Sequence, residues 1–150
     1  MKRILVAIDG SEPAWKALDL AGDLARLWGA RVDLLHVVPP EPPPAGLAAF
    51  ARAERIPLEE ELARWRSERL TGDELVRDGR ERLLAKGVGA VETLVEEGSP
   101  AAAILATAER LGTDLVVVGS RGRTGLAATL LGSVSKRVAE HARCSVLIVR

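Results

Sequence analysis

Residues 114–135 read DLVVVGSRGRTGLAATLLGSVS, and this stretch contains the pattern from which we infer the fold. The apolar run from Leu115 to Val118 is typical of a strand buried on both faces. A glycine-rich segment follows, and Gly132 and Ser133 then open a stretch with a helical pattern. A strand that leads through a glycine-rich turn into a helix is the repeating unit of a parallel α/β sheet.

The same alternation of strand and helix extends along the rest of the chain. Helical stretches lie between the apolar runs, and glycines such as Gly29 and Gly112 mark helix ends. Strands joined by helices predict an α/β fold, with a mainly parallel five-stranded sheet and helices on both faces. A chain of 150 residues is about the size of one domain, so we expect a single domain over 1–150. The predicted strands are 4–8, 32–38, 88–95, 115–118 and 145–149.

Two segments in the first half of the chain depart from this regular alternation. Residues 39–57 hold most of the prolines and are predicted to form a flexible loop. Residues 58–86 are helical in pattern and highly charged. Within them Thr71 to Glu74 has the form of a capping box, which predicts two helices that meet at Gly72.

Composition limits the classes of partner. Basic and acidic residues number 21 each, so no broad basic field favours nucleic acid or an anionic membrane as a partner. No segment has the length and apolar character of a membrane span. The only cysteine, Cys144, excludes a disulfide within the chain and fits the reducing cytoplasm, where we expect the protein to be located.

The glycine-rich segment is also the candidate binding site. In open parallel sheets, ligands bind beyond the carboxyl ends of the strands. Gly132 and Ser133 would place free backbone amides at a helix start, which suits phosphate oxygens, and Arg121 and Arg123 could add charged contacts. The alternative is that the glycines only allow the backbone to turn between the strand and the helix. The residues alone leave both interpretations open.

The pattern resembles a known family at this point. Gly119, two residues, Gly122, nine residues, Gly132 and Ser133 have the spacing of the nucleotide-binding signature of the universal stress proteins. The stretch Asp9-Gly10-Ser11-Glu12 after the first strand and the ending from Ser133 onward are similar to that family too. The resemblance covers almost the whole chain. It implies the architecture of the adenine nucleotide alpha hydrolases, with strand order 3-2-1-4-5.

The resemblance also implies a ligand and a set of binding residues. The ligand would be ATP, with magnesium held mainly by its phosphates and possible help from Asp9. For Asp9 the alternative is a capping role, in which it or Ser11 only satisfies amides of the first helical turn. The implied residues are Ala7, Asp9 and Val37 at the adenosine end, Val118 and Gly119 at the ribose, and Gly122, Gly132, Ser133, Val134 and Ser135 at the phosphates. Arg121 joins them as a candidate because of its charge.

The function expected from these features is that of an ATP-binding sensor or regulator in stress response. No catalytic residues and no protein-only metal site are predicted, because no Ser-His-Asp set, carboxylate pair or zinc pattern is visible. The resemblance further implies a homodimer through Ser145 to Val149, with the protein partner unknown. Two alternatives stay open, which are a dimeric interaction module with weak or no nucleotide binding and a slow magnesium-dependent ATPase.

Overall fold

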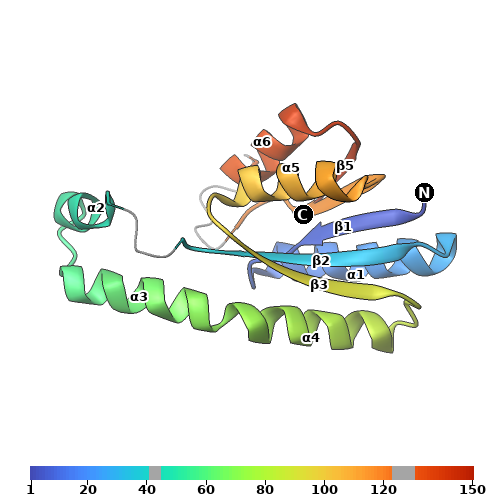
Figure 1. Ribbon diagram of the computed structural model, residues 1–150, viewed down its shortest axis with the longest axis horizontal. Coiled ribbons are helices and arrows are strands. Elements are labelled where there is room, and N and C mark those ends of the chain that lie inside the picture. Colours follow the sequence, from blue (N-terminus) through green and yellow to red (C-terminus); the bar gives the residue numbers. More distant parts are fainter. Residues whose placement is uncertain (41–44, 123–130) are drawn as a thin grey trace.

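A computed structural model, which describes residues 1–40, 45–122 and 131–150, has one sheet between two helical layers (Figure 1). The strand order is β3-β2-β1-β4-β5, and every neighbouring pair is parallel. The predicted α/β fold and strand order are therefore confirmed. The elements are β1 (Arg3–Ala7), α1 (Glu12–Trp28), β2 (Arg31–Val38), α2 (Leu47–Ala53), α3 (Leu58–Leu70), α4 (Gly72–Ala85), β3 (Val91–Glu97), α5 (Pro100–Leu111), β4 (Leu115–Gly119), α6 (Ser133–His141) and β5 (Ser145–Val149).

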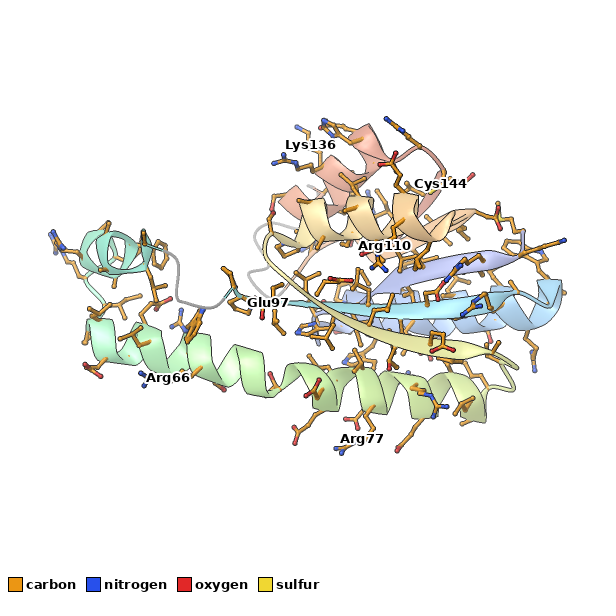
Figure 2. All side chains as sticks on the ribbon, in the orientation of Figure 1. Arg66, Arg77, Glu97, Arg110, Lys136 and Cys144 are labelled. Atoms are coloured by element: carbon orange, nitrogen blue, oxygen red, sulfur yellow. The ribbon has the colours of Figure 1, made fainter. Side chains whose placement is uncertain are left out.

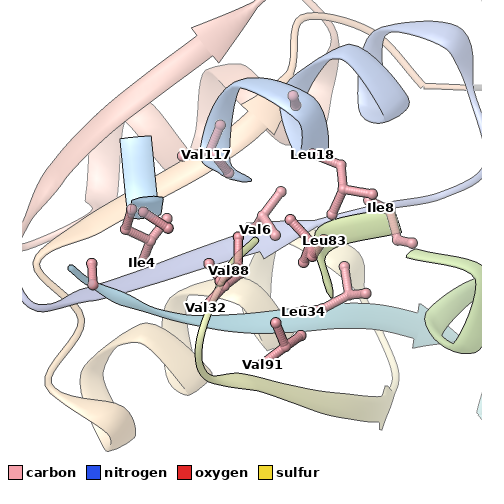
Figure 3. Close-up of a cluster of buried hydrophobic side chains, with 14 of the residues drawn as sticks. Ile4, Val6, Ile8, Leu18, Val32, Leu34, Leu83, Val88, Val91 and Val117 are labelled. Atoms are coloured by element: carbon pink, nitrogen blue, oxygen red, sulfur yellow. The ribbon is translucent and has the colours of Figure 1, made fainter. Parts of the chain in front are cut away.

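The core has two parts because successive strand side chains point to opposite faces of the sheet. Ile4 and Val6 of β1 belong to the cluster that packs against α1 and α4 (Figure 3). Leu5, between them, belongs to the cluster on the α5 and α6 face. All three side chains are fully buried. The continuous apolar run of β1 thus fills both cores, as expected of a central strand.

Local signals set the ends of α1 and α5. Ser11 is the N-cap of α1, and its hydroxyl accepts a hydrogen bond from the Ala14 amide. Gly29 ends α1 in the left-handed conformation at φ 63°, and Gly112 ends α5 at φ 61°. A side chain at either position would be strained, so glycine is suited to both sites.

The prediction of a continuous loop over 39–57 was wrong for residues 47–53, which form α2. Four of its seven residues are alanine, the strongest helix former, and Ala51 is buried. The prolines on both sides of this segment led to the prediction of a loop despite the helix propensity of its alanines. Residues 41–44 lie outside the described residues.

Two further details, between Thr71 and Val91, differ from expectation. Helices α3 and α4 do meet at Gly72, but Thr71 forms no capping box, since its hydroxyl donates to the Ser67 carbonyl one turn back. The third strand begins at Val91 rather than Val88, because the Val88 amide donates to the Leu83 carbonyl at the end of α4.

Helices α2 and α3 extend beyond the carboxyl edge of the sheet (Figure 1). The indole Nε1 of Trp65 in α3 donates to the Pro40 carbonyl at 3.2 Å, which ties α3 to the segment after β2. Arg66 of α3 and Arg77 of α4 point away from the sheet (Figure 2). Among the helices that the structure describes, none combines the length and apolar character that crossing a bilayer requires.

Candidate functional site

One pocket lies at the carboxyl edge of the sheet, where β1 and β4 end side by side. The order β2-β1-β4 places the reversal of chain order between β1 and β4, the position at which open α/β sheets bind ligands. The structure brings all of the sequence-predicted site residues together there, while their role in binding stays a prediction. The residues in question are Ala7, Asp9, Val37, Val118, Gly119, Arg121, Gly122, Gly132, Ser133, Val134 and Ser135.

Gly119, the last residue of β4, is required by packing. A Cβ at this position would lie 2.8 Å from the carbonyl carbon of Pro13 and 2.9 Å from the Ala14 amide nitrogen. Both atoms belong to the backbone of the first turn of α1 and cannot move aside as a side chain can. The glycine therefore lets α1 begin directly against the end of β4, so it contributes to the fold as well as to the pocket.

Asp9 follows β1 and its carboxylate has two distinct environments. Oδ1 accepts a hydrogen bond from the Ser11 amide at 2.9 Å, which closes the turn before the helix, while the first-turn amide of Ala14 is capped by the Ser11 hydroxyl. Oδ2 lies toward Gly122, where an added Cβ would be 2.9 Å away. With this hydrogen bond formed, the Asp9 carboxylate borders the pocket. Ser11 rather than Asp9 therefore fills the capping role, and Asp9 borders the pocket.

The start of α6 brings to the pocket backbone amides that have no acceptor within the helix. The first intrahelical bond runs from the Lys136 amide to the Gly132 carbonyl, so the amides of Ser133, Val134 and Ser135 have no acceptor within the helix. No side-chain cap is formed at this end among the described residues, since Gly132 is the N-cap. Such a helix start favours an anion, through its free amides and its dipole.

The side chain of Ser135 stabilises the start of α6 through hydrogen bonds. Its buried hydroxyl lies 3.0 Å from the carbonyl oxygens of both Ser120 and Gly132, to which it can donate. The Gly132 amide donates to the Ser120 carbonyl at 2.7 Å. The hydroxyl proton of Ser135 is thereby committed to the backbone, and its amide is the group that remains for a ligand.

Sequence reasoning missed four residues that line the pocket. Ile8 and Ala14 flank the β1–α1 turn, and Pro100 and Ile104 belong to the first turns of α5. A usable signal was present, because Ser99 and Pro100 open a helix directly after a parallel strand. Such a helix must begin at the same edge as the other strand ends.

Both histidines and the cysteine lie outside this pocket. His36 is buried, and its Nδ1 lies 2.7 Å from the Ile8 carbonyl oxygen, as expected of a core histidine. Nδ1 of His141 lies 3.0 Å from the Arg137 carbonyl oxygen in the last turn of α6. Burial raises the pKa of the Cys144 thiol, so it is less nucleophilic than an ordinary cysteine. Arg123 falls outside the described residues.

The pocket has the donors and walls that an adenine nucleotide needs. Apolar side chains such as Val37 and Ile104 offer a surface for a base, and the α6 amides with Arg121 offer donors for phosphates. In the described part of the chain, no group of three or more His, Cys, Asp and Glu side chains could hold a metal ion. A magnesium ion would therefore be held chiefly by phosphates and water, with Asp9 as the carboxylate in the same pocket.

Comparison with known proteins places these features in a family. A family model described as the universal stress protein family matches residues 1–150. The universal stress protein YxiE of Bacillus subtilis is 39% identical over 149 residues, which cover 99% of this chain and 98% of the relative. The solved structure of protein MJ0577 has a TM-score of 0.76 at 29% identity and covers 99% of this chain and 94% of that one. A universal stress protein crystallised in complex with cAMP has a TM-score of 0.68 at 26% identity, with coverage of 99% and 96%.

Proposed function

The chain belongs to the universal stress protein family, and we propose that it binds an adenine nucleotide, ATP with magnesium, in the pocket at the carboxyl edge. Occupancy of the pocket would act as a signal in stress response, so the protein is a sensor or regulator. A cytoplasmic location, expected from the single cysteine, is part of this proposal.

The observation that carries the proposal is the uncapped start of α6 inside this pocket. Three successive amides, those of Ser133, Val134 and Ser135, lack intrahelical acceptors and sit on the glycine-rich turn. Backbone amides at a helix start need acceptors from outside the helix, and phosphate oxygens would provide them. Arg121, from the same turn, adds a charged donor at this end of the pocket.

The opposite end of the pocket suits a purine. Ala7, Val37 and Ile104 come from β1, β2 and α5 and present small or branched apolar side chains. Such walls contact both faces of a flat base without requiring a hydrogen bond. The complex of a related universal stress protein with cAMP, which joins adenine, ribose and phosphate, supports a ligand of this type here.

The first test is a thermal-shift titration with ATP, ADP, AMP, cAMP and GTP, each with and without magnesium. A ligand present at about a hundred times its Kd stabilises the fold by roughly 2.7 kcal/mol, which raises Tm measurably. The variant Gly122→Val should lose the shift, because its side chain would displace the Asp9 carboxylate and fill the pocket.

The matched control is Gly89→Val, since an added Cβ at Gly89 meets nothing within 4 Å. It should retain the nucleotide shift of the wild type. Absence of any shift at millimolar nucleotide would overturn the proposal and favour an interaction module. Magnesium-dependent phosphate release that falls in Asp9→Ala would instead identify a slow ATPase.

We also propose that β5 pairs with β5 of a second copy. The strand is an edge of the sheet, and Val146 to Val149 are all half-buried rather than covered. Beside it, α1 carries Leu20, Leu24 and Leu27 at i, i+4 and i+7, and Leu27 is 77% exposed. An uncovered strand edge beside an apolar helix stripe favours association.

Analytical ultracentrifugation tests this pairing through the oligomeric state. The wild type should sediment as a dimer, and Leu27→Lys should sediment as a monomer, because the charge would lie on the exposed α1 stripe beside β5. The control Leu84→Lys changes an exposed apolar residue on α4 and should leave the dimer intact. A monomeric wild type would contradict the proposal.

A further inference from the structure

The glycine-rich turn after β4 is attached to the rest of the fold by two sets of hydrogen bonds. In the first set, the Ser120 amide donates to the Val149 carbonyl of β5 at 2.6 Å, and the Ser120 carbonyl accepts from the Gly132 amide at 2.7 Å. In the second, the Ser11 hydroxyl at the start of α1 donates to the carbonyl of Arg121, the next residue of the turn, at 3.4 Å. Ser11 and Arg121 are 110 positions apart, so the sequence pattern gave no sign of this contact.

The hydroxyl of Ser11 has two separate roles in these contacts. As the N-cap of α1, it accepts a hydrogen bond from the Ala14 amide at 3.4 Å. A serine hydroxyl has two acceptor lone pairs and one proton, so the cap leaves the proton available. That proton is donated to the Arg121 carbonyl. Because capping α1 requires an acceptor alone, the cap does not explain the contact with Arg121.

Ser11 is itself held by Asp9. The Asp9 Oδ1 atom accepts the Ser11 amide at 2.9 Å, and Oδ2 lies toward Gly122. Asp9, Arg121 and Gly122 border the pocket at the carboxyl edge, whereas Ser11 is not among its lining residues. Ser11 therefore connects the turn after β1 to the turn after β4 from outside the pocket.

We propose that Ser11 is a positioning residue for the phosphate end of the pocket. Its hydroxyl holds the peptide unit between Arg121 and Gly122, and so sets the direction of the Arg121 side chain and of the Gly122 amide. A turn that is fixed before binding loses less conformational entropy when phosphate arrives. The hydrogen bond, at 3.4 Å, is near the upper limit of length, so it adds little stability and acts mainly on this geometry.

The effect is confined to one end of the pocket. Val37 and Ile104, at the end proposed for the base, come from β2 and α5 and not from this turn. Loss of the Ser11 hydroxyl should therefore weaken a ligand with phosphates more than one without them. This expectation for affinity rests on the proposed nucleotide binding, whereas the hydrogen bond itself can be tested without nucleotide.

The hydrogen bond is tested in the full-length protein without nucleotide, through the ¹³C resonance of the Arg121 carbonyl. Glycine and aspartate both serve as N-caps, but glycine has no side chain and ionised aspartate has no proton to donate. Ser11→Gly and Ser11→Asp should therefore both shift this resonance upfield, as expected when a carbonyl loses its donor. Ser11→Thr keeps the hydroxyl and should leave the resonance near its wild-type position. The control is Ser99→Gly, at the N-cap of α5, where the side chain forms no cap hydrogen bond.

Calorimetric titration with ATP and magnesium, and separately with adenosine, tests the role in positioning. Ser11→Gly should bind ATP roughly fivefold more weakly, the effect of one ordinary hydrogen bond, and should bind adenosine as the wild type does. Ser11→Thr should retain the affinity for ATP, and Ser99→Gly should retain the affinity for both ligands. Tm values measured alongside show whether each variant is folded.

An Arg121 carbonyl resonance that does not move in Ser11→Gly would overturn the proposal. Equal losses of affinity for ATP and adenosine, or an unchanged affinity for ATP, would overturn it as well. A wild type that binds neither ligand would instead contradict the proposed function, and the carbonyl resonance would still decide whether Ser11 holds the turn.

Discussion

The two edges of the sheet use polar residues in opposite ways. At the amino edge, charged groups are paired within the fold. Arg3 Nε donates to the buried Asp33 carboxylate at 2.6 Å, and the Asp114 carboxylate accepts the amides of Lys2 and Arg3. At the carboxyl edge, Asp9 and Arg121 border a pocket instead. Substitutions at the first edge should therefore reduce stability, and those at the second should mainly reduce binding.

The largest loss of stability is expected for Asp33→Ala. The substitution would leave Arg3 without its bidentate partner and Arg31 without the same carboxylate, which is 1% exposed. Breaking a buried ion pair by removing one partner costs about 3 kcal/mol or more, and somewhat less here because Arg3 is partly exposed. Urea unfolding measures the loss.

The control for Asp33→Ala is Glu96→Ala, which breaks the exposed pair with Arg110 on the same face of the sheet. That loss should be below about 1 kcal/mol. Equal losses in the two variants would contradict the view that the amino edge depends on its buried pair.

Gly119→Ala should cause the next largest loss of stability. It is the exception to the comparison, because Gly119 lies at the carboxyl edge and yet is required by the packing of the fold. Its Cβ would overlap the backbone of Pro13 and Ala14, and overpacking of this kind costs about 1–3 kcal/mol. Gly89→Ala, in open space, serves as the control in the same urea titration. A Gly119→Ala protein as stable as this control would show that the start of α1 moves freely.

Gly122→Ala separates stability from binding, because Gly122 lies in the same turn as Gly119 but faces a side chain rather than backbone atoms. Its Cβ would meet Asp9 Oδ2, which can move. We expect a loss of stability below about 1 kcal/mol, together with weaker nucleotide binding in calorimetric titration. Unchanged nucleotide affinity would remove Asp9 and Gly122 from the proposed site.

The smallest effect concerns Asp114 and appears only in acid. The backbone amides of Lys2 and then Arg3 hold the pKa of this carboxyl below its usual value of about 3.9. Its contribution is therefore present above about pH 4 and is lost as the pH falls through the lower folded pKa. Between about pH 4 and pH 2, stability should fall more steeply in the wild type than in Asp114→Asn. Parallel curves would contradict this role.

Much of the fold was predictable because it depends on local patterns. The apolar runs of β1 and β4 and the glycines at positions 29 and 112 are signals within a few residues. The strand order was not contained in those patterns and came from the family resemblance. Helix α2 was missed because the nearby prolines indicated a loop, although its own alanines favour a helix.

The location of the site was predictable but its details were not. The parallel sheet and the glycine-rich segment indicated which edge holds the site, whereas most of its individual residues came from the family resemblance, and Ile8, Ala14, Pro100 and Ile104 were missed. The reason for Gly119 was not predictable, because its close neighbours Pro13 and Ala14 are about a hundred residues away in sequence. The same holds for Ser135, which the family resemblance placed at the phosphates and whose hydroxyl the fold directs to the carbonyls of Ser120 and Gly132. Contacts between residues distant in sequence determine both the requirement for Gly119 and the Ser135–Ser120 hydrogen bond.

The most direct test of nucleotide binding at the carboxyl edge is an NMR titration of ¹⁵N-labelled protein with ATP and magnesium. The amide resonances of Ser133, Val134 and Ser135 should shift most, because phosphate oxygens would accept hydrogen bonds from them. Those of Thr113 and Cys144, at the amino edge, should shift little. Shifts confined to the amino edge, or none at saturating ATP, would contradict the account.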